Sequence, residues 1–344
     1  MSLLVKGIRG LSELTIDVDK DWADKRIEDI GIPLTDQSLL SRGLVNIYHC
    51  DHGLNWADLG VIATGAATSA AYLGNGIAIV GDSFGHVFRS TNYGATWVDI
   101  GDLGGPILFI ANLGNGIAIL SSTTHIRRST DYGLNWADLG VISAGDIRAI
   151  AYLGNGIAVF GDNAEHVFRS TDYGATWGDL GVITSDNVQI IVYLGNGIAV
   201  LADYDGHIWR STNYGAGWVD LGVVTAGCGI ISMIYLGNGI AVCDDENLYV
   251  FRSTDYGATW TNLGISFLGE PSLMGYLDNG IAIAGDLDKR IYQSNDYGLT
   301  WNSLGIIASS AITTVGYLTN GIAIAGDSNG RIFRSTSAFQ LWRV

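Results

Sequence analysis

The sequence predicts an all-β protein built by repetition of one unit. Glycine is abundant, with 48 residues, and charged residues make up only 15% of the chain. Many short strands joined by glycine turns give this composition. Tryptophan recurs every 39–42 residues, as Trp56, Trp97, Trp136, Trp177, Trp218, Trp260, Trp301 and Trp342. A fixed period of about 40 residues is typical of repeat architectures such as propellers.

One repeat, residues 66–101, contains the signals of four short strands. The four segments are 68–73, 77–80, 86–89 and 97–100. The first two flank Gly74-Asn75-Gly76, and Asn-Gly is a strong hairpin signal because both residues tolerate positive φ. No stretch with helical periodicity interrupts the strands, so the repeat predicts a four-stranded antiparallel propeller blade.

The number of inner hairpins predicts the number of blades. This hairpin occurs seven times, at Gly74, Gly114, Gly154, Gly195, Gly237, Asp278 and Thr319. We therefore predict a seven-bladed β-propeller over residues 43–344, preceded by an attachment or closure segment, residues 1–42. The outer hairpin occurs eight times if residues 45–59 are counted. The alternatives are an eight-bladed ring, or an N-terminal strand that is donated to close the ring.

Charge and cysteine content narrow the classes of partner. The net charge is −16 with 18 basic residues, so we expect no nucleic-acid partner. Cys50, Cys228 and Cys243 lie at different phases of the repeat, which argues against a disulfide framework or a zinc site. We expect no cofactor, no metal and no membrane span. No secretory signal is evident. We expect the protein to be located in a virion or extracellular particle, with the cytoplasm as the alternative location.

The turn before each tryptophan has a repeated polar pattern. Its form is Ser-Thr-Asp-Tyr-Gly-x-x-Trp, with small variations, and copies start at Ser90, Ser129, Ser170, Ser211, Ser253 and Ser294. The short polar side chain can bond to nearby backbone amides, and the glycine allows positive φ. We interpret these residues as structural: Asn92, Trp97, Asp131, Trp136, Asp172, Trp177, Asn213, Trp218, Asp255, Trp260, Asp296 and Trp301.

This turn resembles the Asp-box, or BNR, repeat of sialidase-like propellers. The resemblance implies that the turn is structural and lies on the face away from the ligand site. A second, shorter resemblance covers residues 14–38, where Lys25-Arg26-Ile27-Glu28-Asp29-Ile30-Gly31-Ile32-Pro33 follows a strand-like segment. It is similar to junction segments of phage tail-fibre-like proteins, which implies a virion partner or self-association through residues 1–42. The alternative is an irregular cap or first-blade strands.

Sialidase activity is implied by the family resemblance but lacks support in the residues. The family's Arg-Ile-Pro-type motif is present only as Gly31-Ile32-Pro33. Seven arginines share one repeated strand position or its neighbour: Arg89, Arg127, Arg128, Arg169, Arg210, Arg252 and Arg334. A set spread around a ring cannot converge on one substrate carboxylate. We therefore predict that the protein is not an enzyme, with a sialidase-like glycoside hydrolase as the alternative.

Four histidines invite a metal interpretation, which the repeat argues against. His86, His125, His166 and His207 share one strand position, but later copies have Tyr249, Arg290 and Arg331 there. Equivalent points on neighbouring blades are too far apart for Zn–N bonds of about 2.0–2.1 Å. A position that accepts His, Tyr and Arg is typical of an amphipathic surface, so we predict no metal site.

The turn between the second and third strands supplies the candidate ligand-binding residues. Its repeated acids are Asp82, Asp162, Asp203, Asp245, Asp286 and Asp327, and Phe84 and Tyr204 lie beside them. Such acids usually initiate turns, but they would also form a ring of contacts for a glycan. Trp209 occupies the position of the repeat that holds Phe88 and Phe168 in other copies, so we place it in the core.

These observations predict a non-enzymatic recognition or structural propeller that binds a glycan or a protein on one face. A virion tail-fibre or spike component fits this prediction. A cytoplasmic assembly scaffold, similar to the Asp-box assembly factors of photosynthetic organisms, is a further alternative.

Overall fold

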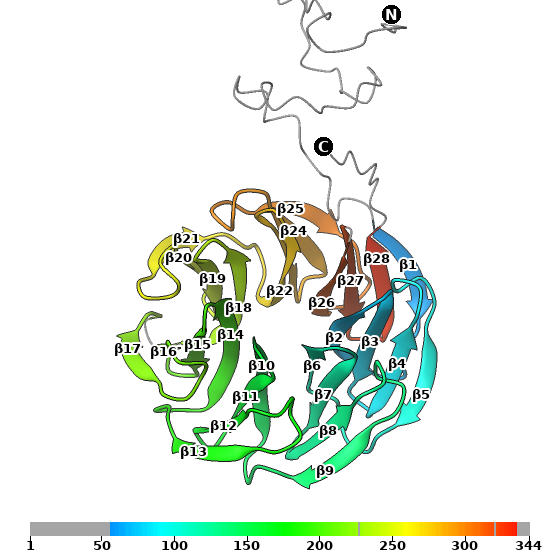
Figure 1. Cartoon of the computed structure of the whole chain (residues 1–344). Coiled ribbons are helices and arrows are strands. Elements are labelled where there is room, and N and C mark those ends of the chain that lie inside the picture. Colours follow the sequence, from blue (N-terminus) through cyan, green and yellow to red (C-terminus); the bar gives the residue numbers. More distant parts are fainter. Residues whose placement is uncertain (1–55, 226–227, 320, 336–344) are drawn as a thin grey trace, which may run out of the picture. The chain divides into compact units, whose positions relative to one another are not determined.

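Seven four-stranded antiparallel sheets form a ring (Figure 1). The structure is a computed structural model that describes residues 56–225, 228–319 and 321–335. These residues contain β-strands and no helix, and all belong to one compact unit, residues 52–337. The predicted all-β class and seven blades are confirmed, and the eight-bladed alternative is wrong. The predicted attachment segment, residues 1–42, lies outside the described residues.

Each blade consists of an inner, a second, a third and an outer strand. The inner strands are β2 (Ala67–Gly74), β6 (Phe109–Gly114), β10 (Ile147–Gly154), β14 (Val188–Gly195), β18 (Ile230–Gly237), β22 (Pro271–Asp278) and β26 (Ile312–Thr319). The second strands are β3 (Ile77–Asp82), β7 (Ile117–Ser122), β11 (Ile157–Asp162), β15 (Ile198–Asp203), β19 (Ile240–Asp245), β23 (Ile281–Asp286) and β27 (Ile322–Asp327).

The third strands are β4 (His86–Ser90), β8 (His125–Ser129), β12 (His166–Ser170), β16 (His207–Ser211), β20 (Tyr249–Ser253), β24 (Arg290–Ser294) and β28 (Arg331–Ser335). The outer strands are β5 (Val98–Asp102), β9 (Ala137–Val141), β13 (Gly178–Val182), β17 (Val219–Val223), β21 (Thr261–Ile265), β25 (Asn302–Ile306) and β1 (Trp56–Val61). We number the blades 1 to 7 from the inner strands β2 to β26.

The ring closes by exchange between distant parts of the chain. Blade 7 takes β26, β27 and β28 from the last repeat and β1 from the first described residues. Strand β1 pairs antiparallel with β28, with Trp56 opposite Ser335 and Asp58 opposite Phe333. The predicted alternative of a donated N-terminal strand is therefore correct. It explains why the sequence holds more outer hairpins than inner hairpins.

Left-handed backbone positions in the turns follow the repeated residues. Asn75 and Gly76 have φ of 52° and 77°, as a two-residue hairpin between right-twisted strands requires. In the turn before the outer strand, Tyr93 and Gly94 have φ of 56° and 73°. The glycine was predicted from the sequence, whereas the tyrosine was not, because tyrosine has no special tolerance for positive φ.

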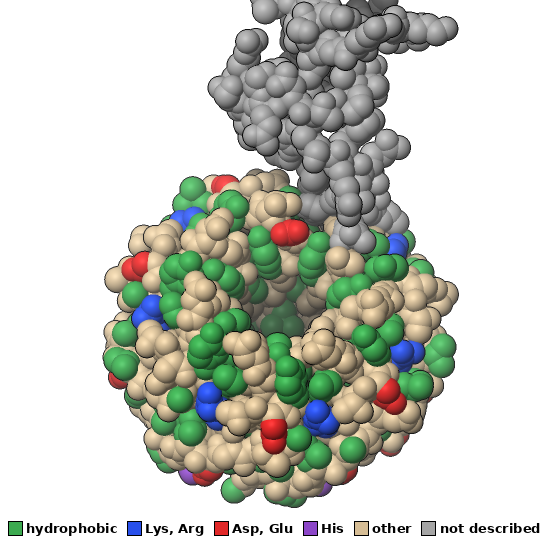
Figure 2. All heavy atoms as spheres, in the orientation of Figure 1, with side chains coloured by type: hydrophobic (Ala, Val, Ile, Leu, Met, Phe, Trp, Pro, Cys, Tyr) green, Lys and Arg blue, Asp and Glu red, His purple; other side chains and the backbone are tan. Residues whose placement is uncertain are grey.

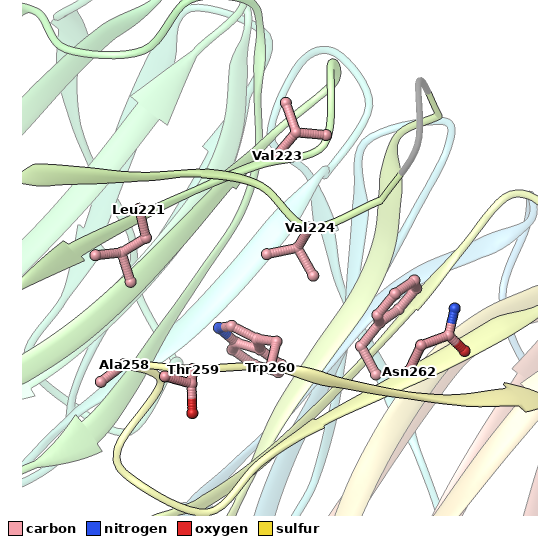
Figure 3. Close-up of a pocket in the computed structure, with 8 residues that line it drawn as sticks. Leu221, Val223, Val224, Ala258, Thr259, Trp260 and Asn262 are labelled. Carbon is pink, nitrogen blue, oxygen red and sulfur yellow. The ribbon is translucent and has the colours of Figure 1, made fainter.

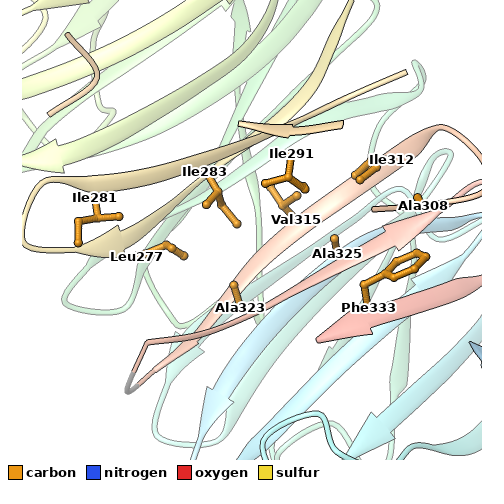
Figure 4. Close-up of a cluster of buried hydrophobic side chains, with 10 residues drawn as sticks. All are labelled: Leu277, Ile281, Ile283, Ile291, Ala308, Ile312, Val315, Ala323, Ala325 and Phe333. Atoms are coloured by element: carbon orange, nitrogen blue, oxygen red, sulfur yellow. The ribbon is translucent and has the colours of Figure 1, made fainter. Parts of the chain in front are cut away.

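The hydrophobic core is divided among the junctions between blades. One cluster, which includes Leu277, Ile283, Ile312 and Phe333, fills the junction of blades 6 and 7 (Figure 4). Each blade contributes to two such clusters because successive strand residues point to opposite faces of its sheet. This packing places the repeated hydrophobic residues between sheets and leaves the turns at the two ends of the strands free for function.

The turns define two faces of the ring. The tyrosine face carries the turns between inner and second strands and between third and outer strands. The carboxylate face carries the turns between second and third strands and the loops that lead from each outer strand to the next blade. Figure 2 shows one face, with hydrophobic side chains gathered around a central hollow and basic side chains spaced further out.

Two cysteines lie within the described residues, and both are free thiols. Cys228 is half-buried and Cys243 is buried. Among the described residues, no helix is long and apolar enough to span a membrane.

Candidate functional site

On the carboxylate face, Asp82 ties two loops of blade 1 together. Its Oδ1 accepts hydrogen bonds from the backbone N–H groups of Phe84 and His86 at 3.0 and 2.9 Å. Its Oδ2 accepts from the N–H and the hydroxyl of Thr64 at 3.0 and 2.6 Å, and from the N–H of Gly65. Burial raises the pKa of Asp82, but the hydrogen bonds outweigh it and the pKa is lowered overall.

The other five candidate acids repeat this arrangement and are equally buried. Each accepts at Oδ1 from the N–H group four residues later: Asp162 from His166, Asp203 from His207, Asp245 from Tyr249, Asp286 from Arg290 and Asp327 from Arg331. The donor to Oδ2 differs from blade to blade. Asp162 accepts from Ser143, Asp203 from Ser185 and Trp209, Asp245 from Cys228, and Asp286 from Tyr292 and Arg290. Asp327 Oδ2 is buried without a partner among the described residues.

This burial decides what the six carboxylates can do directly. All are at most 2% exposed, so they hold the loops in place and leave ligand contact to the residues around them. The two aromatic candidates are available for contact, because Phe84 is 65% and Tyr204 46% exposed. Leu268 and Leu287 are also exposed on this face and were missed, since a single leucine in a variable loop has no pattern. Trp209 packs at the junction of blades 3 and 4, as predicted.

The carboxylate face is also acidic at its surface. Its turns and loops contain seven acids that are exposed or half-buried: Asp146, Glu165, Asp186, Asp205, Glu246, Glu270 and Asp288. An eighth exposed acid, Asp102, is the last residue of β5.

The four histidines form separate pairs with acids of the outer strands. The Nδ1–Oδ distances are 2.8 Å for His86–Asp99, 3.3 Å for His125–Asp138, 2.9 Å for His166–Asp179 and 3.1 Å for His207–Asp220. Arg331 takes the same place beside Asp58. The hydrogen bond that His86 Nδ1 donates to the Asp99 carboxylate is the main cause of the raised pKa of His86. Among the described residues, no group of His, Cys, Asp and Glu side chains could hold a metal ion.

The repeated arginines connect neighbouring blades. Each Nε donates to a tyrosine carbonyl oxygen of the next blade at 2.7–2.9 Å: Arg89 to Tyr132, Arg128 to Tyr173, Arg169 to Tyr214, Arg210 to Tyr256, Arg252 to Tyr297 and Arg334 to Tyr93. Arg127 instead pairs with Asp138. These guanidinium groups lie on different blades around the ring, so they cannot bind one substrate carboxylate together.

On the tyrosine face, the turn with Asp172 shows the local role of the repeated acid. Oδ1 accepts from the N–H groups of Ala175 and Thr176 at 3.0 and 2.9 Å, and Oδ2 accepts from the Thr176 hydroxyl at 2.6 Å. Burial raises the pKa of Asp172, but these bonds and that from Ser170 outweigh it and lower the pKa. Trp177 is half-buried beside Phe160, with ring centroids 4.9 Å apart. These contacts stabilise the turn and the junction between blades.

Comparisons with solved structures support the fold. The chain resembles YCF48 bound to a D1 peptide, with 15% identity, a TM-score of 0.68 and coverage of 82% of this chain and 96% of the other. It also resembles virginiamycin B lyase from Staphylococcus aureus with quinupristin, with 11% identity, a TM-score of 0.71 and coverage of 81% and 98%.

The WD40 propeller domain of Doa1 is similar at 10% identity and a TM-score of 0.69, with coverage of 84% and 98%. At these identities the similarity concerns the fold alone. A scan of protein-family models gave no match, and neither did a search of curated protein sequences.

Proposed function

We propose that the protein is a non-enzymatic recognition module whose ligand, a protein or a glycan, docks on the carboxylate face. The observation that carries this proposal is that loops held in place by buried acids present exposed side chains that differ from blade to blade. Buried acids such as Asp82 fix the loops, while Phe84 and Tyr204 project from different blades. Rigid scaffolds that present variable loops are a common basis of recognition.

The proposal includes the assignment of the repeated turns as Asp-boxes. The hydrogen bonds of Asp131, Asp172, Asp255 and Asp296 support it, because all four accept the N–H groups three and four residues later. In this assignment the tyrosine face is structural. YCF48, with the same fold, binds a D1 peptide, whereas virginiamycin B lyase is an enzyme, so the fold is compatible with both functions. The spread of the arginines favours binding.

A virion tail-fibre or spike is our proposed carrier, with residues 1–42 as the segment for a virion partner or for self-association. The basis is the sequence of residues 14–38. Immunogold labelling of particles with an antibody to the propeller tests it. Label confined to the cytoplasm of producing cells would contradict it and favour an assembly scaffold.

The binding proposal is tested with a glycan array and a phage-displayed random peptide library. Ligands retained by the wild type are then measured against Phe84→Ser/Tyr204→Ser and against the control Leu134→Ser/Leu299→Ser. Leu134 and Leu299 are exposed on the tyrosine face. We expect loss of binding in the first variant alone. Equal loss in both, or hydrolysis of a fluorogenic sialoside or aryl glycoside by the wild type, would contradict the proposal.

A further inference from the structure

Every blade has an Asn-Gly pair at the tip of its inner hairpin, and a further pair, Asn329-Gly330, lies in a turn of blade 7. Asparagine is thermolabile, and it is especially so before glycine, which has no side chain to hinder attack of its nitrogen on the asparagine amide. The glycine nitrogen forms a bond to Cγ, the Cγ–Nδ2 bond breaks, and ammonia leaves with the proton of the glycine N–H. Water then opens the cyclic imide at Cγ to give aspartate, or at the main-chain carbonyl to give isoaspartate.

In most blades a tyrosine hydroxyl holds the N–H group that must lose its proton in this reaction. In blade 1 the N–H of Gly76 donates to the Tyr72 hydroxyl at 3.0 Å. Five other blades have the same bond, at 3.1–3.4 Å: Gly156 to Tyr152, Gly197 to Tyr193, Gly239 to Tyr235, Gly280 to Tyr276 and Gly321 to Tyr317. The N–H of Gly330 donates to the carbonyl oxygen of Asp327 at 3.1 Å. Each of these bonds has to break before the nitrogen can attack.

Blade 2 lacks this restraint in the hairpin between β6 and β7. Asn112 stands at the position of the tyrosine. Its Nδ2 donates to the carbonyl oxygen of Tyr72 at 2.9 Å, and its Oδ1 accepts from the N–H of Gly114 at 2.8 Å. Both ends of this side chain are therefore engaged away from Gly116. In the part of the chain that the structure describes, no group accepts a hydrogen bond from the N–H of Gly116.

The other properties of the hairpin are the same in blades 1 to 5. The local sequence Leu-Gly-Asn-Gly-Ile-Ala is identical at residues 73–78, 113–118, 153–158, 194–199 and 236–241. Asn115 and Gly116 have φ of 53° and 76°, and Asn155 and Gly156 have φ of 53° and 78°. Both asparagines are exposed and both glycines are buried. The tyrosine bond is therefore the difference that bears on the reactivity of these two pairs.

We propose that Asn115 is a modification site, at which the folded protein deamidates spontaneously before its other Asn-Gly pairs react. The aspartate product adds a negative charge to the tyrosine face. The isoaspartate product routes the main chain through Cγ, which adds one atom to the two-residue turn. Gly114 and Ile117 are paired across this turn. A two-residue hairpin turn depends on a defined backbone conformation, so isoaspartate weakens the pairing of β6 with β7.

The test is peptide mapping of the full chain after incubation in mildly alkaline buffer. Trypsin places six of the asparagines in separate peptides, because Lys or Arg residues lie between them: Asn75, Asn115, Asn155, Asn196, Asn238 and Asn279. Mass spectrometry with electron-transfer fragmentation then distinguishes asparagine, aspartate and isoaspartate in each peptide. We expect Asn115 to react roughly three- to tenfold faster than Asn155, as loss of one hydrogen bond predicts.

The unfolded chain provides the control for sequence effects. In denaturant the tyrosine bonds are absent, and the five identical hairpin sequences should react at equal rates. A faster reaction of Asn115 in the folded protein alone would therefore come from the structure around Gly116.

Two reciprocal variants test the role of the hydroxyl group. Asn112→Tyr gives blade 2 the residue of the other blades and should slow Asn115 to the rate of Asn155. Tyr152→Phe keeps the ring in blade 3 but removes the acceptor for Gly156, so Asn155 should react roughly three- to tenfold faster. The matched control is Tyr173→Phe. Its ring centroid lies 6.5 Å from that of Tyr152, but its hydroxyl does not bond to Gly156, so Asn155 should be unaffected.

Three outcomes would overturn the proposal. The first is a folded wild type in which Asn115 reacts no faster than Asn155. The second is an equally large excess of Asn115 reaction in denaturant, which would indicate an effect of the flanking sequence. The third is Tyr173→Phe speeding Asn155 as much as Tyr152→Phe does, because a general loosening of the hairpin would then explain the rates. The circular dichroism spectrum of each variant confirms that the propeller is folded during the incubation.

Discussion

Arg334 and Tyr93 join the last blade to the first. The Nε of Arg334 donates a hydrogen bond of 2.7 Å to the carbonyl oxygen of Tyr93, which lies 241 residues earlier in the chain. The same bond links blades 2 and 3 through Arg128 and Tyr173. At the closing junction it acts together with the pairing of β1 and β28. The ring is therefore closed both by backbone pairing and by a repeated side-chain bond.

Replacing Arg334 with Gln should loosen the closing junction selectively. Blade 6 has Gln293 at this position, so the residue is compatible with the strand. We expect a loss of about 1 kcal/mol in the free energy of unfolding. We also expect faster amide hydrogen exchange in β1 and β28. Arg128→Gln is the control, with a similar loss of stability but unchanged exchange in β1. Unchanged exchange in β1 of the Arg334 variant would show that strand pairing alone closes the ring.

Asp82 and Asp327 provide a matched test of the buried acids. Both carboxylate oxygens of Asp82 accept hydrogen bonds, with Thr64 and Gly65 as donors to one and Phe84 as a donor to the other. Asparagine has only one accepting oxygen, so Asp82→Asn places an N–H₂ group against donors on one side. We expect a loss of about 2–3 kcal/mol by urea unfolding at pH 7. Asp327→Asn should cost less than about 1 kcal/mol, because Oδ2 has no donor to lose.

The pH dependence of the Asp82 variant follows from the lowered pKa of the wild-type residue. A lowered pKa means that this carboxylate stabilises the folded protein above the unfolded pKa, and that the stabilisation is lost as pH falls through the folded pKa. The difference between wild type and Asp82→Asn should therefore shrink below about pH 4. A constant difference down to pH 2, or equal losses in the Asp82 and Asp327 variants, would contradict the role of the charge.

Asp244 should destabilise the protein at neutral pH. Other blades have Gly, Ala or Ser at its position, as at Gly81, Ser121 and Ala202. Its Oδ1 accepts from the N–H of Ser232 at 2.9 Å, but Oδ2 has no partner among the described residues. Burial raises its pKa well above the usual value. The folded state then retains a proton that the unfolded chain releases, so stability falls as pH rises above about 4.

Asp244→Asn keeps the acceptor for Ser232 and removes the titration. The variant should gain stability over the wild type as pH rises from about 4 to 8, as measured by urea unfolding at each pH. Asp245→Ala, which removes the acceptor, is the opposite control. Asp245 Oδ1 accepts backbone N–H groups of Asn247 and Tyr249, so this variant should lose stability. A gain for Asp244→Asn that does not vary with pH would exclude a buried proton at this position.

Asp278 is expected to store backbone strain. Its φ is 120°, at a position where five other blades have glycine, as Gly237 does with φ of 87°. Residues with side chains are disfavoured there, at a cost of about 1–3 kcal/mol. Asp278→Gly should raise the melting temperature, and Gly237→Asp should lower it, in differential scanning calorimetry. A lower melting temperature for Asp278→Gly would show that the aspartate side chain contributes more than the strain costs.

The turns of this protein are determined by the sequence itself. Asn75-Gly76 specifies a hairpin, and Asp172 specifies its turn by bonding to amides within four residues. Such interactions need only neighbouring residues, so they repeat wherever the residues repeat. The strands of blade 1 were predicted to within two residues for the same reason, and the count of inner hairpins gave the number of blades.

Tertiary structure decided what depends on segments far apart in the chain. Pairing of β1 with β28, the bond from Arg334 to Tyr93 and the buried state of Asp82 form only once the ring is closed or the loops meet. The sequence shows Asp82 as a turn acid but not that Thr64 occupies its second oxygen. The groove lined by Leu221, Phe251 and Trp260 likewise exists because blade 5 packs against blade 4 (Figure 3). Local patterns carry information about dihedral angles, whereas burial and contact between blades arise from packing.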